Sequence, residues 1–348
     1  MALSDPVLRE RLAADPWTGH NIRLSPAVTT LPGAPDFLRT DRRLLGILRT
    51  LSVLYRGELA GLRVADLGCL EGGFALALAQ QGARVLAVDA REANLDKVRL
   101  LIEHFGLANL EVACADVKEF TRERHGEFDV VLCLGLLYHL DRPVAWLRQV
   151  AAMTRAVLIV DTHMAPEEDA IEELDPALGR LGPLEDRDDG GAQTRGRWFP
   201  EGALGANRSR ERWTAFSNAA SFWLDKASLV AAFRHAGFES IFEQKDWIAD
   251  AHAVYGRKLS RAVFVALKSA AFAPALPPQE EAPASFDPAI GGVAAVAAAA
   301  PVPLESWRRL RRIDAGFQDY LRRRRLGRCL RLYWRLRSGA GWILRRRR

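Results

Sequence analysis

The sequence has few cysteines and no long hydrophobic run. Its four cysteines, among 348 residues, are scattered and form no CxxC pair, which argues against a zinc site and against a disulfide framework. No stretch of about 18 strongly apolar residues occurs, so a spanning helix is not expected. The charged N-terminal stretch MALSDPVLRERLAADP is not typical of a signal peptide. These absences predict a cytoplasmic protein with reduced thiols and no bound metal.

Lysine is absent from residues 305–348, whereas arginine is abundant there. This tail holds 16 arginines and three acids, a formal charge of +13, although the whole chain carries only +6. The remaining 304 residues are therefore mildly acidic, at −7. The asymmetry predicts two functional parts, an acidic body and a basic tail.

Apolar strand-like runs alternate with helical patterns between residues 61 and 164. Such strands with helices between them are typical of a parallel sheet covered on both faces. The sequence therefore predicts an α/β fold with a Rossmann-like, doubly wound, mostly parallel seven-stranded sheet. The predicted segments are a helical N-terminal segment (1–60), the core (61–164), an insertion or lid (165–215), the completion of the sheet (216–270), an Ala/Pro-rich linker (271–304) and a basic amphipathic tail (305–348).

The stretch VADLGCLEGG, residues 64–73, ends a predicted strand in an acid followed by a glycine-rich turn. Glycine allows a sharp turn and a close approach of the backbone to a ligand. The spacing G-x-x-x-G-G differs from the G-x-G-x-x-G of dinucleotide sites, and Asp66 would repel a pyrophosphate. Asp89 ends the next strand, where a carboxylate suits ribose hydroxyls, and Asp116 ends the strand after it. These acids favour a ligand with a cationic group, a ribose and an adenine but no phosphate, such as S-adenosylmethionine (SAM).

Residues 62–164 resemble the class I SAM-dependent methyltransferases. Four segments carry the likeness in order: VADLGCLEGG, VLAVDA, ACADV and FDVVLCLGLLYHLDRP. The resemblance implies that the methionine part and the sulfonium are held by Asp66, Gly68, Cys69, Leu70, Gly72, Leu134 and Gly135. It implies that the ribose and adenine are held by Asp89, Ala90, Asp116 and Val117. Position 70 departs from the family, which commonly has glycine there, and the leucine narrows the predicted pocket.

Three side chains near the predicted methyl donor are candidates for catalysis. Tyr138 and His139 lie in LLYHLDRP, and His163 ends the following strand. A histidine can take a proton from a hydroxyl during attack on the sulfonium. Two alternatives stay open: His139 is a packed core residue, or methyl transfer proceeds by positioning without an essential base.

Residues 195–223 concentrate tryptophan and phenylalanine beside arginine. This combination suits stacking on a sugar or base and pairing with an anion, and it equally suits a lid held in place by its aromatic side chains. The candidate substrate-binding residues are Arg197, Trp198, Trp213, Asn218 and Trp223.

The predicted reaction is SAM-dependent O-methylation of a small-molecule, glycan or lipid-linked acceptor. Residues 195–223, together with the segment SFWLDKASLVAAFRHAGF, are also similar to the tRNA wobble-uridine carboxymethyltransferases, which use a carboxylated SAM. A tRNA-modifying (carboxy)methyltransferase is therefore one alternative. A non-catalytic scaffold of the same fold, acting through its tail, is the other.

The tail places apolar residues at a helical spacing between its arginines. They are Trp307, Leu310, Ile313, Phe317, Tyr320 and Leu321. A basic amphipathic helix of this kind suits an anionic membrane surface, here the inner one, or the phosphates of RNA. Packing on the body or on a second subunit is the third alternative, and the oligomeric state stays open.

Overall fold

The computed structural model describes residues 2–166, 178–202, 211, 213–244 and 261–268. All of them belong to the first of two compact units, residues 1–276. The second unit, residues 277–348, contains the predicted basic tail and most of the predicted linker, which lie outside the described residues.

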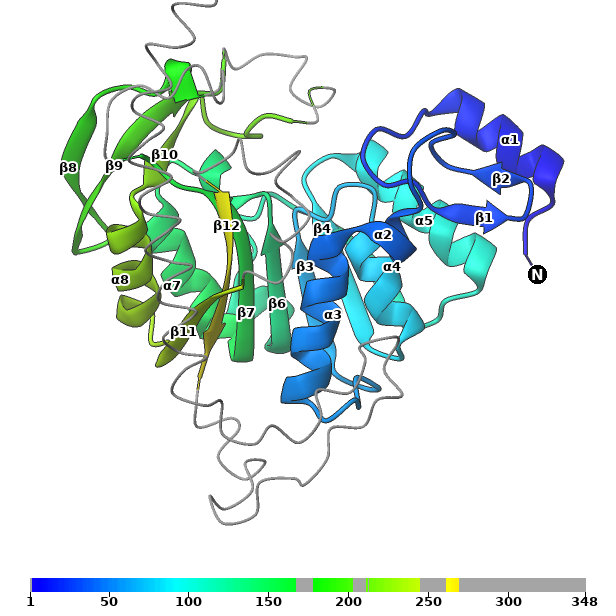
Figure 1. Cartoon of the computed structure of the whole chain (residues 1–348), viewed down its shortest axis with the longest axis horizontal. Coiled ribbons are helices and arrows are strands. Elements are labelled where there is room, and N and C mark those ends of the chain that lie inside the picture. Colours follow the sequence, from blue (N-terminus) through cyan, green and yellow to red (C-terminus); the bar gives the residue numbers. More distant parts are fainter. Residues whose placement is uncertain (1, 167–177, 203–210, 212, 245–260, 269–348) are drawn as a thin grey trace, which may run out of the picture. The chain divides into compact units, whose positions relative to one another are not determined.

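A seven-stranded sheet with the order β11-β12-β7-β6-β3-β4-β5 forms the centre of the first unit (Figure 1). The pairs from β5 to β7 are parallel, and β12 runs antiparallel to both of its neighbours. The strands are β3 (Arg63–Leu67), β4 (Arg84–Asp89), β5 (Leu110–Cys114), β6 (Phe128–Leu134), β7 (Thr154–His163), β11 (Ser240–Gln244) and β12 (Arg261–Leu267). The prediction of a doubly wound, mostly parallel seven-stranded sheet is confirmed.

Helices cover both faces of this sheet because its strands are apolar on both sides. One face packs against α3 (Arg42–Leu54), α4 (Gly73–Gln80) and α5 (Glu92–Phe105). The other packs against α7 (Pro143–Met153) and α8 (Lys226–His235). Successive strand residues alternate between the two cores, so that Val64 faces the first and Ala65 the second.

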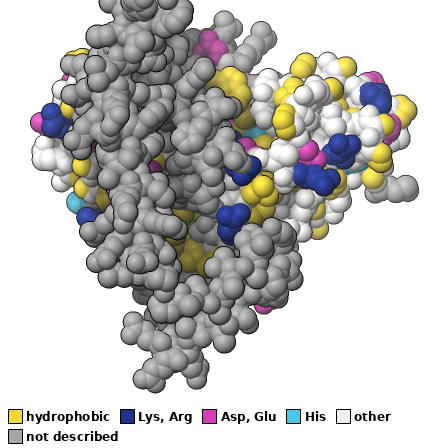
Figure 2. Space-filling view, viewed as in Figure 1, with side chains coloured by type: hydrophobic (Ala, Val, Ile, Leu, Met, Phe, Trp, Pro, Cys, Tyr) yellow, Lys and Arg dark blue, Asp and Glu magenta, His cyan; other side chains and the backbone are white. Residues whose placement is uncertain are grey.

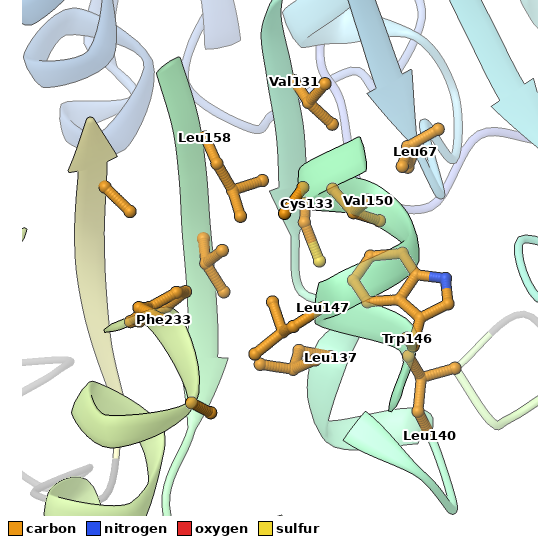
Figure 3. Close-up of a cluster of buried hydrophobic side chains, with 14 of the residues drawn as sticks. Leu67, Val131, Cys133, Leu137, Leu140, Trp146, Leu147, Val150, Leu158 and Phe233 are labelled. Atoms are coloured by element: carbon orange, nitrogen blue, oxygen red, sulfur yellow. The ribbon is translucent and has the colours of Figure 1, made fainter. Parts of the chain in front are cut away.

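The second core is built around α7 (Figure 3). Trp146, Leu147 and Val150 of this helix belong to the same buried cluster as Val131 and Cys133 of β6. The short helix α6 (Arg122–His125) and the 3-10 turn η1 (Leu137–His139) precede and follow β6. The core side chains that surround η1 hold it close to the carboxyl end of β6.

A second, three-stranded antiparallel sheet is built from β8 (Leu184–Asp189), β9 (Ala192–Pro200) and β10 (Ala220–Leu224), preceded by η2 (Leu178–Arg180). Its β8–β9 hairpin turns through Gly190 and Gly191, which have φ angles of 66° and 81°. Positive φ at both central residues is the geometry that favours glycine in a two-residue hairpin loop. The predicted boundary at residue 215 divides this sheet, because β10 pairs with β9 and not with the large sheet. We call these three strands the lid sheet.

The sequence pattern predicted a helical N-terminal segment, but the segment is only partly helical. It contains α1 (Asp5–Ala14), α2 (Phe37–Thr40) and a two-stranded hairpin of β1 (Arg23–Ser25) and β2 (Val28–Thr29) before α3. Residues of α1 and the hairpin pack on α4 and α5, forming a separate small core. The hairpin strands have only three and two residues, which is too short for their period to show in the sequence.

On the face shown in Figure 2, basic and acidic side chains lie close together over the part of the chain that is not grey. This mixture fits the mildly acidic body and contrasts with the strongly basic composition of residues 305–348. Within the described ranges, no helix is both long and apolar enough to cross a membrane.

Candidate active site

The carboxyl ends of the parallel strands bring the predicted cofactor residues to one edge of the sheet. Asp66 and Leu67 of β3 pair with Ala87 and Val88 of β4, and Leu67 also pairs with Cys133 of β6. In open α/β sheets, ligands bind in the crevice at this edge.

Asp66 carries a buried carboxylate with an unused acceptor. Its side chain is 1% exposed, and no described residue donates a hydrogen bond to Oδ2. Burial raises the pKa of Asp66 to about 7, a rise that the amide of Ala75 opposes and the charge of Asp89 increases. Because an ionised carboxylate here lacks full compensation, the position suits a cationic partner.

Asp89 is held at the tip of β4 by the backbone of two loops. The amide of Leu70 donates to Oδ2 at 3.1 Å, and the amide of Arg91 donates to Oδ1 at 2.9 Å. Burial raises the pKa of Asp89 against these bonds. These two bonds therefore fix the direction of the Asp89 carboxylate.

The glycine loop adopts left-handed backbone at three positions. Gly68, Leu70 and Gly72 have φ angles of 72°, 51° and 73°. A Cβ on Gly72 would lie 2.7 Å from Cγ2 of Val98. Leu70 keeps the conformation that glycine adopts easily, at a cost of about 1–2 kcal/mol. This conformation gives a physical reason for the glycine that the family commonly has at position 70.

Glu71 ties the glycine loop to the N-terminal segment, a connection that sequence reasoning missed. Its carboxylate accepts from the amides of Thr18, Gly19 and His20 at 2.6, 2.9 and 2.8 Å. Nζ of Lys97 lies 3.1 Å from Oε1. Burial raises the pKa of Glu71, but these bonds and the lysine charge outweigh it and hold the pKa below its ordinary value. The only signal in the sequence was an acid inside a turn otherwise made of glycine and apolar residues.

His20 supports the same loop from the N-terminal side. Its Nδ1 accepts from the amide of Gly73 at 3.0 Å, so this nitrogen carries no proton. Burial lowers the pKa of His20 to about 4, which keeps the ring neutral. A Cβ on Gly73 would lie 2.9 Å from this ring and 2.7 Å from Phe37, which explains the second glycine of the pair.

The remaining predicted cofactor residues lie along the same edge. The amide of Ala115 donates to the carbonyl of Asp89, which places the turn after β5 beside β4. Asp116 is half-buried, and its Oδ1 accepts from the amide of Lys118 at 3.0 Å. The others are Cys69 and Val117, which are buried, and Ala90, Leu134 and Gly135, which are half-buried.

A buried ion triad lies beside the predicted sulfonium position. Asp161 of β7 accepts from Arg261 through two bonds of 2.8 and 2.6 Å and from Arg43 of α3 at 3.0 Å. Burial opposes ionisation of Asp161, but the two guanidinium groups lower its pKa to about 2. A Cβ on Gly135 would lie 3.5 Å from Nη2 of Arg261, so a guanidinium group lies next to this glycine. Nη2 of Arg43 also lies 3.3 Å from a carboxylate oxygen of Asp41.

His139 makes a hydrogen bond to a carboxylate from the lid region. Nδ1 of His139 lies 2.7 Å from Oε1 of Glu201, which follows β9. Oε1 also accepts from the hydroxyl of Ser221 at 2.8 Å, and Oε2 accepts from the amide of Ala215 at 2.9 Å. Sequence reasoning proposed His139 but missed Glu201, because the partners are 62 residues apart.

Tyr138 and His163 lie together in an aromatic cluster. Their ring centroids are 4.7 Å apart, and His163 stacks on Trp223 at 4.9 Å. Burial raises the pKa of Tyr138, so its hydroxyl stays protonated at neutral pH. His163 is buried, with 8% of its surface exposed. The ring of Tyr138 contacts the rings of both His139 and His163, so the three catalytic candidates lie together at the same end of the sheet.

The five predicted substrate-binding residues are divided between three environments. Arg197 and Trp223 are buried within the lid sheet, where Arg197 donates to the carbonyls of residues 166 and 182. Trp198 donates from Nε1 to Glu185 on the exposed side of the lid sheet. Trp213 and Asn218 belong to the segment before β10.

This segment, residues 213–218, connects the cofactor side to η1. Trp213 is 61% exposed and would lie 3.4 Å from a Cβ on Gly19. Nη2 of Arg91 donates to the carbonyl of Thr214 at 2.9 Å. At the other end of the segment, Nδ2 of Asn218 donates to the carbonyl of His139 at 2.9 Å. In the described part of the chain, no group of three or more His, Cys, Asp and Glu is placed to bind a metal.

Two comparisons with known sequences agree with this geometry. Residues 64–157 match the family described as a methyltransferase domain. The ubiquinone biosynthesis O-methyltransferase of Acinetobacter baylyi (strain ATCC 33305 / BD413 / ADP1) is 37% identical over 91 residues, which cover 26% of this chain and 38% of that protein. The protein of the same name from Bordetella avium (strain 197N) is 35% identical over 99 residues, covering 28% and 41%. The matches thus span less than half of these relatives.

A longer likeness is found among solved structures. The N-terminal domain of EvdMO1, crystallised in the presence of SAH and D-fucose, superposes with a TM-score of 0.57 and 25% sequence identity. The match covers 76% of this chain and 97% of that one. The same domain with SAH bound gives a TM-score of 0.56 at 25% identity, covering 76% and 96%.

Proposed function

From the class I SAM-dependent methyltransferase domain that residues 64–157 form, we infer that this chain transfers a methyl group from SAM to an oxygen of a small-molecule or glycan acceptor. The observation that carries the inference is the buried acceptor Oδ2 of Asp66, with no donor in the described part of the chain, next to the fixed carboxylate of Asp89. An unpaired buried carboxylate is costly, and a cationic ligand relieves the cost. A phosphate at the same place would increase it.

The residues at the strand ends fit SAM by charge and by polarity. Asp66 would hold the ammonium group, and Asp89 would accept from the ribose hydroxyls. The guanidinium of Arg261 beside Gly135 would complement a carboxylate, which is the remaining charged group of the methionine part. When bound, SAM supplies an activated methyl group to the acceptor.

The acceptor class is supported by the relatives and by the lid. Relatives matched over part of their length are O-methyltransferases, and the EvdMO1 domain was crystallised with D-fucose and SAH. Residues 213–218 are bonded to Arg91, after β4, at one end and to η1 at the other, and we propose that the acceptor enters beside this segment. We therefore propose a hydroxyl acceptor, with Tyr138, His139 and His163 lining the reaction site and Trp213 as an exposed contact.

Calorimetry with S-adenosylhomocysteine (SAH), the demethylated product of SAM, tests the cofactor step. The full chain should bind SAH, and Asp89→Ala should weaken binding about 10- to 100-fold, as expected for the loss of charged hydrogen bonds. Asp96→Ala is the matched control, because Asp96 is an exposed carboxylate paired with Arg99 on α5. A chain that binds NAD or a nucleoside triphosphate and not SAH would overturn the proposal.

Release of SAH from SAM tests the acceptor. D-fucose, catechol and unfractionated tRNA serve as probes for a glycan, a phenol and the nucleic-acid alternative. Turnover with D-fucose or catechol supports the proposal, whereas turnover confined to tRNA supports the tRNA-modifying alternative. SAH binding without turnover of any added acceptor class supports the scaffold alternative.

For the basic tail, which lies outside the described residues, we propose an anionic membrane surface as the partner. The support is its sequence, which places Trp307 and Leu310 on the apolar stripe between arginines. Vesicles with anionic phospholipid should carry the full chain in flotation, and Trp307→Ser with Leu310→Ser should abolish this. If the double variant floats as well as the wild type, the membrane proposal is wrong, since phosphate binding needs no apolar stripe. The proposal is also wrong if the full chain binds tRNA but does not float with the vesicles.

A further inference from the structure

We propose that Glu201 is a positioning residue that makes His139 the proton acceptor for the hydroxyl that is methylated, an inference that rests on the proposed O-methylation. The observation is the 2.7 Å hydrogen bond between Nδ1 of His139 and Oε1 of Glu201. His139 ends η1 at the carboxyl edge of the large sheet, and Glu201 follows the central strand of the lid sheet. The lid therefore contributes a side chain to the reaction site.

The direction of this hydrogen bond follows from the other partners of Glu201. The amide of Ala215 can only donate, and it donates to Oε2. Burial raises the pKa of Glu201, but the bonds from His139, Ala215 and Ser221 outweigh it and hold the pKa below its ordinary value. An ionised carboxylate only accepts, so Nδ1 of His139 carries the hydrogen. In the neutral ring, Nε2 is then left with a lone pair.

The surroundings leave this lone pair available. The His139 side chain is 15% exposed, whereas that of Glu201 is 1% exposed. No described residue makes a hydrogen bond to Nε2 of His139. The backbone is fixed as well, because Asn218 donates to the carbonyl of His139 and the amide of Phe222 donates to that of Leu140 at 2.8 Å. The ring thus has Nδ1 bonded to Glu201, whereas Nε2 has no hydrogen-bond partner among the described residues.

A purely structural clamp is the competing explanation. Burying a carboxylate only to fasten the lid is a costly solution, since well-packed apolar side chains of similar volume serve as well. A histidine oriented by a carboxylate is instead the arrangement by which a general base is activated.

The proton and electron balance of the step is simple. Nε2 of His139 takes the proton of the acceptor hydroxyl while the oxygen bonds to the methyl carbon, and the carbon–sulfur bond breaks with its electron pair going to sulfur. The products are a methyl ether, SAH and an imidazolium paired with Glu201. The imidazolium then returns its proton to solvent, and no other reactant is needed.

The substitution Glu201→Gln distinguishes the two explanations. The amide of Ala215 requires an oxygen at the Oε2 position, so the nitrogen of the new side-chain amide would be directed to Nδ1 of His139. Nδ1 would become an acceptor, and the hydrogen would move to Nε2. The variant keeps the size and the fold of the site but selects the tautomer that cannot accept a proton.

Two measurements read this change. In the full chain labelled with ¹⁵N-histidine, His139, one of seven histidines, should show the Nδ1–H tautomer, and Glu201→Gln should convert it to Nε2–H. The signal is assigned with the His139→Gln variant. With D-fucose or catechol as acceptor, kcat should fall about 100-fold or more with KM changed little. Glu185→Gln, an exposed lid carboxylate that accepts from Trp198, is the matched control and should change neither.

The outcomes separate this inference from the proposed function. If calorimetry shows that the wild-type chain does not bind SAH, the proposed function is wrong. If the wild-type chain binds SAH and turns over, but Glu201→Gln keeps the tautomer and the kcat of the wild type, Glu201 is only a clamp and the inference is wrong.

Discussion

Nζ of Lys97 lies 3.1 Å from Oε1 of Glu71, and both side chains are almost completely buried, at 2% and 0% exposure. The pair joins α5 to the glycine loop, and the same carboxylate holds the amides of residues 18–20. The glycine loop is thus positioned by residues outside the region 64–157, which matches a methyltransferase domain. The N-terminal segment therefore supports the glycine loop of the candidate site directly.

Lys97→Met should destabilise the protein strongly. It leaves the carboxylate of Glu71 buried without its cation, a change that costs about 3–5 kcal/mol. Urea unfolding measures the loss, and hydrogen exchange of residues 18–20 should rise with it. Lys226→Met is the control, because the Lys226 side chain is 53% exposed and its pair with Glu243 lies at the surface, where such a pair contributes about 0–1 kcal/mol. Equal effects of the two variants would contradict the role given to Glu71.

Asp66→Asn should separate stability from cofactor binding. The pKa of Asp66 is about 7 in the folded chain and lower when unfolded, so the unfolded state binds fewer protons between about pH 4 and 7. Stability of the ligand-free wild type therefore falls as pH rises through this window, and the asparagine variant should lack that fall. At pH 8 the variant should be more stable by about 1 kcal/mol or more, yet bind SAH about 10-fold more weakly or worse. Thermal unfolding at pH 4 and 8, with calorimetry, tests both; a variant less stable than wild type at pH 8 would refute the argument.

Gly72→Ala and Gly106→Ala form a matched pair. Both glycines have positive φ, 73° and 64°, so both substitutions introduce left-handed strain of about 1–2 kcal/mol. Only at position 72 would the new Cβ collide with Val98, whereas nothing lies within 4 Å at position 106. Gly72→Ala should therefore cost about 1–3 kcal/mol more than Gly106→Ala and weaken SAH binding. Urea titrations measure the free energy of unfolding of both variants, and calorimetry measures their SAH binding. Indistinguishable results would show that the glycine loop accommodates the new Cβ without a loss of stability.

Arg261→Met should raise the pH of acid unfolding. Asp161 has a pKa of about 2 when folded and a higher one unfolded, so its contribution is complete above about pH 4 and is lost as pH falls towards 2. Removing the bidentate partner raises the pKa of Asp161 and moves this loss to higher pH. Circular dichroism from pH 7 to 2 records the transition. Arg155→Met, which removes an exposed arginine paired with Glu127, should leave the transition nearly unchanged.

The candidate cofactor residues that the sequence predicted are local in the chain. Asp66, Gly68 and Asp89 each follow from a strand, a turn and a helix within a few residues, because strand ends of a parallel sheet must meet at one edge. The large sheet was predictable for the same reason. The left-handed angle at Leu70 was not, since local propensity favours other conformations for leucine.

Residues that act across long separations could not be predicted. Glu201 reaches His139 through a lid sheet whose first strand, LEDRDD, has little apolar pattern. The contacts of Glu71 depend on how residues 17–22 fold back, which two very short strands do not reveal. In both cases a buried acid has partners that only the tertiary structure brings to it.

The position of β12 between β7 and β11 has a consequence for synthesis. Asp161 lies 100 residues before Arg261, so at about 5–20 residues per second the ribosome needs about 5–20 s to supply its bidentate partner. Until then the edge of β7 stays unpaired in the nascent chain, and an open apolar edge strand is a template for aggregation. Newly made chains should therefore depend on chaperones during this interval, and translation that stalls before residue 261 should yield insoluble product.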